Sequence, residues 1–405
     1  MRKSLLITGG ENLFQRIKRQ CAEAQRNGVI LHKLSIGQPA GPALLGARFA
    51  ASEAIMSDKE SMHEYQDNTC HGVPDFARRF VQCHVKTNLL RLGDDVIDFL
   101  PIPGIKPMLG VVIKSLGSWM PLSAKRQVGT MTEPGYPTPV DQCKYIRGVQ
   151  HISLPLGESS GFLFSVDDLN DLGFSEGDMI MLNFPHNPSG IVAQREWLEQ
   201  ICAYCEENGI RIFNDAAYAI LSHSLESVTL TDVAINFPRL SWAEAFSASK
   251  AGNNTGWRVA AMAGSPEFMG DVKTIKGNTD SGFVAAMASG IIELYERYPE
   301  SIEEVRKLYQ TRLDLLINIL PSAGMQLAVS PRAGFFALFK CPLYAFGEKI
   351  KDADRFNELM IQNTGIVGVP FGPFGLYVRY AVCAYDVEAN RTMLTDGFCK
   401  AQVSY

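Results

Sequence analysis

Short apolar runs alternate with longer amphipathic stretches through the middle of the chain, from about residue 95 to residue 260. The apolar runs lie at 96–104, 178–184, 210–215, 242–249 and 258–264, and the amphipathic stretches at 106–119 and 195–209. Gly209 is a typical helix stop at the end of the second stretch. Buried strands that alternate with helices are typical of βαβ units, so the pattern predicts an α/β fold with a mostly parallel sheet.

The pattern changes after about residue 285. One long amphipathic stretch at 289–324 is followed by short apolar runs and a further helical stretch, at 333–339, 366–372, 376–382 and 352–364. These shorter elements predict a second, smaller α+β domain, and we expect the helical stretch at 11–28 to pack with it. The predicted large domain spans residues 45–285, and the small domain combines residues 1–44 with 286–405.

Composition is that of a globular protein with a large core. The chain has 405 residues, of which 46% are hydrophobic and 20% charged, and its formal net charge is -5. No basic block is long enough to follow a phosphate backbone, which argues against a nucleic-acid partner. No run approaches the roughly 20 apolar residues of a membrane helix, and the run before Gly9 is too short for a signal-peptide core. We therefore expect a cytoplasmic protein without membrane contact.

Nine cysteines are scattered through apparent core segments. Cys202 and Cys205 have CxxC spacing, but they share the apolar face of the predicted helix at 195–209 with Leu198 and Ile201. A second cysteine pair or a histidine pair is missing, so no metal site is predicted. A redox dithiol is the other interpretation of this pair, although buried free cysteines usually behave as small hydrophobic residues.

Polar residues follow the predicted strands where parallel sheets place function, at their carboxyl ends. Two prolines in the turn NFPHNPSG (183–190) make it rigid and hold Asn187 as a fixed hydrogen-bonding group. Asp215 ends the next strand, with Tyr218 three residues later. A strand-end aspartate is often a helix cap, but a buried carboxylate needs a facing cation, such as a protonated ring nitrogen.

Lys250 lies in the segment SASKAGNNTGWRVA (247–260), among small residues. A surface lysine is the simple interpretation. A desolvated lysine near another cation is instead a nucleophile, because its pKa falls and its lone pair becomes available. Ser247, Ser249 and Arg258 are residue types that bind a phosphate.

Residues 247–250 (SASK) and 256–258 (GWR) resemble the lysine signature of the class I and II aminotransferases, which are fold-type I pyridoxal-phosphate enzymes. Other segments resemble further motifs of this family in the same order along the chain, at 36–39, 134–137, 183–190, 215–218 and 377–379. The resemblance covers nearly the whole chain. It implies a large domain built on a mostly parallel seven-stranded sheet between helices, and a smaller α+β domain.

The resemblance also implies roles for single residues. Lys250 would hold pyridoxal 5'-phosphate as a Schiff base and then move the Cα proton of the substrate. Asp215 would keep the ring nitrogen protonated, so that the ring accepts electrons. Asn187 and Tyr218 would hydrogen-bond the phenolic oxygen. Tyr136 would stack on the ring, although it also fits an ordinary core tyrosine beside a turn.

Anion-binding roles follow from the same resemblance. The phosphate contacts would come from Ser247, Ser249, Arg258 and a helix N-terminus at Gly104, Ile105 and Lys106. Arg379 would form a bidentate pair with the substrate carboxylate, beside Gly37 and Asn187.

The resemblance further implies a homodimer with shared active sites, in which a tyrosine of the partner subunit reaches the phosphate. Tyr65 is the candidate for this role. The spacing departs from the family pattern, because Gly72 follows Tyr65 at seven positions and the usual interval is shorter.

Three weaker hints, at 11–17, 103–106 and 276–282, resemble the LL-diaminopimelate aminotransferase and alanine/glutamate transaminase branch. The predicted reaction is a ping-pong transfer from an L-amino acid to a 2-oxo acid, with 2-oxoglutarate as the default acceptor, through aldimine and ketimine forms. A carbon–sulfur lyase or another elimination enzyme on the same fold is the alternative. A non-catalytic, cofactor-binding regulatory domain would need a DNA-binding module, for which we find no room before Gly37.

Overall fold

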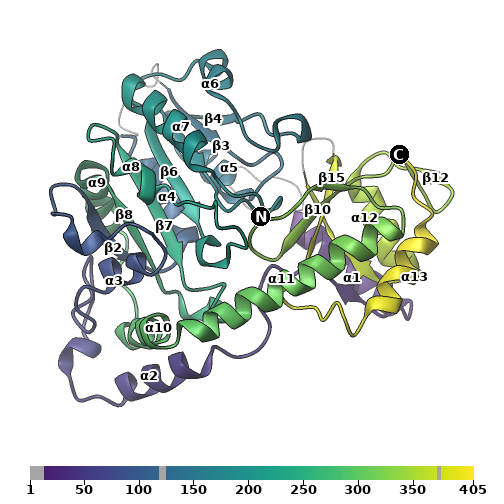
Figure 1. The fold of residues 1–405 in the computed structure, drawn as a ribbon, viewed down its shortest axis with the longest axis horizontal. Helices are drawn as coiled ribbons and strands as arrows, with labels where there is room; N and C mark the ends of the chain where they lie inside the picture. The colour runs from purple at the N-terminus through teal and green to yellow at the C-terminus, as the bar shows by residue number, and fades with distance from the viewer. Residues whose placement is uncertain (1–12, 118–124, 372–374) are drawn as a thin grey trace, which may run out of the picture.

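The computed structural model describes residues 13–117, 125–371 and 375–405. Its main element is a seven-stranded sheet with the order β2-β8-β7-β6-β5-β3-β4 (Figure 1). The strands are β2 (Asp98–Ile102), β3 (Arg126–Thr130), β4 (Val149–Ser153), β5 (Met179–Leu182), β6 (Arg211–Ala216), β7 (Trp242–Ser247) and β8 (Ala260–Gly264). All neighbours pair in parallel except β8, which is antiparallel to β2 and β7. The predicted mostly parallel sheet is confirmed.

Helices cover both faces of this sheet, as the unbroken apolar character of its strands requires. In β5, Met179 and Met181 belong to one apolar cluster, and Ile180 and Leu182 belong to the other. The first cluster includes side chains of α4 (Ile105–Lys114), α5 (Thr138–Cys143) and α9 (Pro266–Gly277). The second includes side chains of α3 (Phe76–Gln82), α6 (Val166–Leu172), α7 (Arg195–Asn208) and α8 (Thr231–Ala234).

The long amphipathic stretch at 289–324 forms two helices rather than one. These are α10 (Ala285–Arg297) and α11 (Pro299–Ser322), and α10 packs along α2 (Leu45–Ile55). The break falls at Tyr298, whose backbone leaves the helical region (φ -130°, ψ 46°). Pro299 explains it, because a proline disfavours helical geometry in the preceding residue and is well placed at the start of the next helix.

The C-terminal part of the chain builds a four-stranded antiparallel sheet of order β14-β15-β10-β9. Its strands are β9 (Leu327–Val329), β10 (Phe336–Lys340), β14 (Val369–Phe371) and β15 (Tyr377–Ala381). Shorter strand pairs are β1 (His32–Lys33) with β13 (Ile366–Val367), and β11 (Tyr344–Ala345) with β12 (Glu348–Lys349). Helices α1 (Leu13–Arg26), α12 (Ala353–Thr364) and α13 (Arg391–Ala401) lie on this side of the molecule (Figure 1).

Helix α1 packs on α12 through a small apolar cluster that includes Ile17, Cys21 and Ile361. Helix α11 runs from the large sheet to the smaller one (Figure 1). We propose that the two sheets mark two domains with bounds at 45–285 and at 1–44 with 286–405.

The sheet topology brings several loops to one edge. Strands β3, β5, β6 and β7 run in the same direction, and β2 shares it because two antiparallel pairings separate β2 from β7. The antiparallel β8 begins at this edge, with Ala260 opposite both Ile102 and Ser247. Segments that follow β2, β5, β6 and β7 therefore meet Arg258, which precedes β8.

The CxxC pair lies in the core. Cys202 and Cys205 are unpaired thiols with no exposed surface, and burial raises the pKa of Cys202 to about 12. A reactive dithiol needs the opposite shift. Within the described residues, no helix is long and apolar enough to cross a membrane, and no cluster of three His, Cys, Asp or Glu side chains has metal-binding geometry.

We expect two helical glycines to respond oppositely to alanine. A Cβ at Gly290 in α10 would collide with the Ala47 carbonyl oxygen of α2, whereas a Cβ at Gly270 in α9 meets no atom within 4 Å. Gly270→Ala should stabilise the protein by roughly 0.5–1 kcal/mol, and Gly290→Ala should destabilise it by about 1–3 kcal/mol. Urea unfolding measures both. A Gly290→Ala protein as stable as wild type would contradict the close packing of α2 on α10.

Candidate active site

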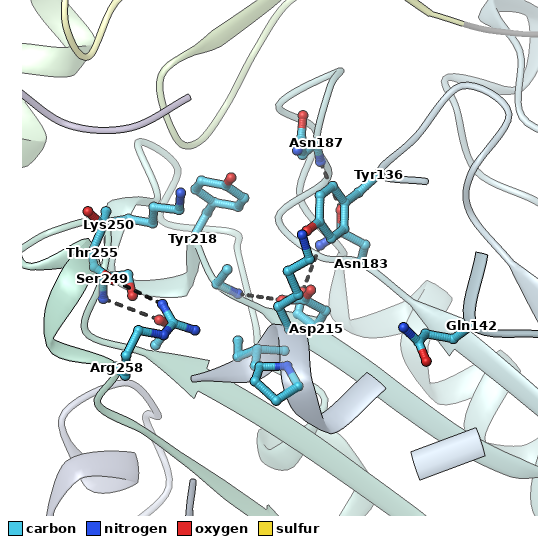
Figure 2. A pocket seen from close by; sticks show the side chains of 15 residues that line it. Tyr136, Gln142, Asn183, Asn187, Asp215, Tyr218, Ser249, Lys250, Thr255 and Arg258 are labelled. Carbon is cyan, nitrogen blue, oxygen red and sulfur yellow. Dashed lines mark hydrogen bonds between the residues drawn. The ribbon is translucent and has the colours of Figure 1, made fainter. Parts of the chain in front are cut away.

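A cavity of about 640 Å³ opens at the sheet edge where these loops meet (Figure 2). Its lining comes from segments that follow β2, β3, β5, β6 and β7. The lining residues are Ile105, Lys106, Pro107, Tyr136, Gln142, Asn183, Asn187, Asp215, Ala217, Tyr218, Ser247, Ser249, Lys250, Thr255 and Arg258.

Asp215 places a carboxylate in this cavity from near the end of β6. Its Oδ1 accepts from the Ala217 backbone N–H at 3.2 Å. Burial raises the pKa of Asp215 from 3.8 to about 6, and the Ala217 hydrogen bond and the charge of Lys250 oppose the rise only in part. No cation of the described residues forms an ion pair with this carboxylate, so a cationic ligand would find an acidic partner here.

Lys250 places its amine in the same cavity, where Nζ donates to the Gly37 carbonyl at 2.9 Å. Nζ also lies 5.8 Å from the centre of the Tyr218 ring. Burial lowers the pKa of Lys250, and the nearby charges of Arg379 and Arg258 act in the same direction. The amine is thus easier to deprotonate than a surface lysine, as nucleophilic and proton-transfer chemistry requires.

One corner of the cavity has the donors of an anion site. Helix α4 begins after Gly104, whose positive φ of 85° and lack of a Cβ let the Arg258 guanidinium approach the helix N-terminus. Arg258 Nη1 donates to the Thr255 carbonyl at 2.9 Å, while Ser247 and Ser249 line the same cavity. Free backbone N–H groups at a helix start, an arginine and hydroxyls together suit a phosphate.

Arg379 lies next to the cavity lining, on β15 in the centre of the small sheet. Its Nη1 donates to Asn187 Oδ1 at 2.9 Å and its Nη2 to the Ser35 carbonyl at 3.1 Å. The guanidinium carbon lies 4.3 Å from the centre of the Phe336 ring. Burial lowers the pKa of Arg379 to about 10, and no carboxylate of the described residues pairs with it. A carboxylate ligand would supply the missing counter-charge.

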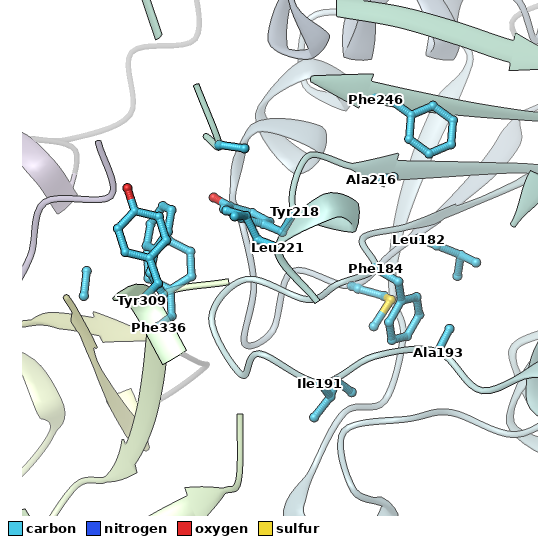
Figure 3. Packing of buried hydrophobic residues seen from close by; sticks show 14 of the residues in the cluster. Leu182, Phe184, Ile191, Ala193, Ala216, Tyr218, Leu221, Phe246, Tyr309 and Phe336 are labelled. Atoms are coloured by element: carbon cyan, nitrogen blue, oxygen red, sulfur yellow. The ribbon is translucent and has the colours of Figure 1, made fainter. Parts of the chain in front are cut away.

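Tyr218 is fixed by aromatic packing beside the small sheet (Figure 3). Its ring meets those of Phe335 and Phe336 edge-on, each with centroids 5.5 Å apart. This packing leaves the Tyr218 side chain in the cavity wall beside Lys250, and burial raises the pKa of its hydroxyl, which therefore stays protonated.

The structure brings most of the sequence-predicted residues together. Ten line the cavity, namely Ile105, Lys106, Tyr136, Asn187, Asp215, Tyr218, Ser247, Ser249, Lys250 and Arg258. Gly104, Gly37 and Arg379 contact lining residues directly. Tyr65 does not line this cavity, and its side chain is 78% exposed.

Some lining residues were missed by sequence reasoning. Asn183 begins the predicted turn, and Thr255 lies between Lys250 and Arg258, so their neighbourhood was the available signal. Gln142 gave none, because a glutamine in the short helix α5 looks like ordinary surface polarity. Residues 11 and 12, part of one subgroup hint, lie outside the described residues.

Solved aminotransferases share this fold. The aspartate aminotransferase of Rhizobium meliloti aligns over 99% of this chain and 98% of its own, with a TM-score of 0.83 and 20% sequence identity. A probable N-succinyldiaminopimelate aminotransferase of Thermus thermophilus aligns over 96% and 99%, with a TM-score of 0.78 and 21% identity. The fold is thus that of fold-type I aminotransferases, as predicted.

The chain belongs to the class I and II aminotransferases, because the sequence model of that family matches residues 29–394. The LL-diaminopimelate aminotransferase of Methanocaldococcus jannaschii is 29% identical over 387 residues, or 94% of this chain and 88% of the relative. The LL-diaminopimelate aminotransferase of Methanococcus maripaludis is 33% identical over 258 residues, which are 63% of this chain and 61% of the relative. The chain is therefore an aminotransferase, and enzymes of this family use pyridoxal phosphate.

Removing the Asp215 charge should stabilise the cofactor-free protein. The raised pKa means that the ionised carboxylate destabilises the folded state. This destabilisation is complete above about pH 6 and absent below about pH 4, where the carboxyl group is protonated in both the folded and the unfolded state. Asp215→Asn should therefore gain up to about 3 kcal/mol at pH 8, a gain that shrinks as the pH falls through 6.

Thermal unfolding of the cofactor-free protein at pH 8 and pH 4.5 measures this difference. Asp98→Asn is the control, because Asp98 accepts from Lys273 Nζ at 2.6 Å and its loss brings no such gain. An Asp215→Asn protein less stable than wild type at pH 8 would contradict the electrostatic account.

Proposed function

We propose that this aminotransferase moves the amino group of an L-amino acid to a 2-oxo acid with pyridoxal phosphate held in the cavity. One observation carries the proposal. The amine of Lys250 and the carboxylate of Asp215 share one cavity beside an anion site, and among the described residues each is hydrogen-bonded to a backbone group rather than paired with an opposite charge. A ligand with a cationic ring nitrogen, a carbonyl group and a phosphate complements all three features.

The residues present fit that cofactor. Arg258, Ser247, Ser249 and the N-terminus of α4 with Lys106 would bind the phosphate. Asp215 would face the ring nitrogen and keep it protonated, because the ion pair lifts the desolvation penalty of the carboxylate. Donors from Tyr218 and Asn187 would reach the phenolic oxygen. Asn187 Oδ1 already accepts from Arg379, so its Nδ2 remains as a donor.

When bound, pyridoxal phosphate condenses with amines and delocalises the negative charge that forms at the Cα of an amino acid. Lys250 Nζ would remove the Cα proton of the amino acid as a general base and hold that proton for its return as a general acid. Its lowered pKa favours this role. Tyr136 would stack on one face of the ring and exclude water from it.

Arg379 would bind the substrate carboxylate and orient the Cα–H bond towards Lys250. Its side chain is 3% exposed and is held by Asn187, by the Ser35 carbonyl and by the Phe336 ring. A planar guanidinium fixed in this way offers a bidentate pair of donors, which sets the orientation of the α-carboxylate in both the amino acid and the 2-oxo acid.

The names of the relatives favour diaminopimelate or a related amino acid as the donor. As the acceptor we propose 2-oxoglutarate, the default for the family. We further propose a cytoplasmic homodimer in which Tyr65 serves the phosphate site of the partner copy. Two features support the dimer. The Tyr65 side chain is 78% exposed. Large apolar side chains in α2 and at its C-terminal end are also exposed, with Phe49 at 64% and Met56 at 80%.

Single-turnover spectroscopy tests the function. We expect purified protein to carry a yellow chromophore, to convert to the pyridoxamine form when the amino donor is added, and to recover its colour with a 2-oxo acid. Release of pyruvate and ammonia without the pyridoxamine form would favour the carbon–sulfur lyase instead.

Lys250 variants separate proton transfer from charge. Lys250→Ala should slow the half-reaction by roughly 10²- to 10⁴-fold or more, the range that general acid–base catalysis contributes. Lys250→Arg keeps the positive charge but cannot release its proton, so it should be equally slow. Stopped-flow absorbance measures the rate. A Lys250→Ala enzyme that transaminates at the normal rate would overturn the assignment.

Arg379→Lys should impair both substrates equally, because both carry the α-carboxylate. We expect kcat/KM to fall by roughly 10- to 100-fold, since a lost hydrogen bond to a charged group costs about 1.5–3 kcal/mol. Steady-state kinetics with each substrate varied in turn measures the effect. Arg355→Lys is the control, because Arg355 pairs with Glu348 and Glu358 at the surface. A change for the amino acid alone would contradict the proposed role.

A further inference from the structure

The side-chain amide of Asn183 connects the segment that carries Asp215 to the segment that holds Arg379. Asn183, the residue after β5, donates from Nδ2 to the Asp215 carbonyl at 2.8 Å. Its Oδ1 accepts from the Asn187 backbone N–H at 3.1 Å (Figure 2). Asn187 Oδ1 in turn accepts from Arg379 Nη1 at 2.9 Å. A continuous path of hydrogen bonds therefore leads from the backbone of Asp215 to the guanidinium of Arg379.

A second amide, outside the cavity lining, holds the turn on which Asn187 lies. Asn214 is 2% exposed, and its side-chain amide hydrogen-bonds both the N–H and the carbonyl of Phe184. Its Oδ1 accepts from the Phe184 N–H at 2.8 Å, and its Nδ2 donates to the Phe184 carbonyl at 3.1 Å. Backbone pairing of β5 with β6 ends at Leu182 opposite Asn214, so this side chain continues the sheet where backbone pairing stops.

Glu244 on β7 fixes the orientation of the Asn214 amide. Its side chain is fully buried, and Oε1 accepts from Asn214 Nδ2 at 2.7 Å and from the Leu230 N–H at 3.1 Å. Oε2 accepts from the N–H and the hydroxyl of Thr231, each at 2.7 Å. Burial raises the pKa of Glu244 to about 7, but Oε1 also faces the Leu230 N–H and therefore accepts. An accepting oxygen requires the NH₂ group of Asn214 to face it, so the oxygen of that amide must face the Phe184 N–H.

The side chain of Phe184 anchors the same turn from behind. Phe184 lies among buried apolar side chains such as Ile191 and Ala193 (Figure 3). It is 3% exposed and meets the Trp197 ring of α7 with centroids 5.1 Å apart. The turn is therefore held by packing on one side and by Asn214 and Asn183 on the other. Loss of either amide would leave buried backbone groups unpaired and release the position of Asn187.

We propose that Asn183 and Asn214 are positioning residues that fix the distance and angle between the Asp215 carboxylate and the Arg379 guanidinium, with Glu244 as their support. The inference rests on the proposed function, in which Asp215 faces the cofactor ring and Arg379 faces the substrate carboxylate. Asn214 and Glu244 lie outside the cavity lining, so they act through Asn183, Asn187 and the turn between them.

The Asn214→Asp variant tests this relay. It keeps the side-chain volume but replaces the donor at Nδ2 with an acceptor that faces Glu244 and the Phe184 carbonyl. Asp178→Asn is the matched control at the opposite edge of the sheet. Asp178 is 2% exposed and accepts from Gln127 N at 2.8 Å and Ser175 N at 2.8 Å, so asparagine there places a donor against donors.

Three measurements separate positioning from loss of stability. They are thermal unfolding of the cofactor-free protein, its dissociation constant for pyridoxal phosphate from tryptophan fluorescence, and kcat and KM for each substrate. We expect both variants to lower the melting temperature. Only Asn214→Asp should weaken pyridoxal phosphate binding several-fold and lower kcat/KM by about 10- to 100-fold for both substrates, since small misplacements of binding groups are that costly.

Asn183→Ala provides a second route if Asn214→Asp does not fold. It removes both bonds at the centre of the relay without burying a charge, and the same pair of losses is expected. Changes in binding and kinetics no larger than those of Asp178→Asn would overturn the relay, provided that wild type binds pyridoxal phosphate and transfers amino groups. A wild-type protein that does neither would overturn the proposed function itself.

Discussion

The candidate active site depends on three buried ionisable side chains that have no ion-pair partner among the described residues. Asp215, Lys250 and Arg379 all have pKa values shifted towards their neutral forms by burial. Each shift reports a charge that the folded protein holds at a cost in stability. The surrounding core must offset that cost. In return, the cavity offers a ligand the Asp215 carboxylate and the Lys250 amine, with the Arg379 guanidinium beside its lining.

The sheet meets this constraint through its topology. Parallel strands β5, β6 and β7 deliver Asn187, Asp215 and Lys250 to one edge, and the reversed β8 returns Arg258 to the same place. Backbone hydrogen bonds between these strands are satisfied within the sheet, so the residues just beyond them start from fixed positions. Side-chain amides then extend that order into the turn at 183–190, beyond the point where the backbone pairing of β5 with β6 ends.

The cavity residues that could be predicted from the sequence lie in short segments with a recognisable local pattern. Lys250, Asp215 and Asn187 each lie in a short segment whose glycines, prolines and strand pattern constrain the backbone, so their placement needed little knowledge of distant parts. The mostly parallel sheet followed from the alternation of buried runs and helices. Gln142 and the pair of Asn214 with Glu244 could not be found in this way, because a polar residue in a strand or short helix reveals its partner only after folding.

The split of the stretch at 289–324 carries the same lesson at the level of helices. The amphipathic period continues across Tyr298, and only the steric demand of Pro299 ends the first helix. The amphipathic period indicates which side chains face the core, whereas the backbone restriction at Pro299 determines where the helix axis changes direction. That turn sends α11 away from α10 and towards the small sheet, which holds Arg379.

The proposed reacting groups and the proposed dimer contact lie on different parts of the molecule. The groups that we propose to act on the α-carbon and its carboxylate lie at the sheet edge or on β15, where Arg379 donates to Asn187 Oδ1 at 2.9 Å. Tyr65 instead lies on a loop whose backbone is anchored by the buried Lys276 and the Ser281 carbonyl while its side chain points outward. An anchored loop with an exposed aromatic side chain suits contact with another surface, as the proposed contact of Tyr65 with the phosphate site of the partner copy requires.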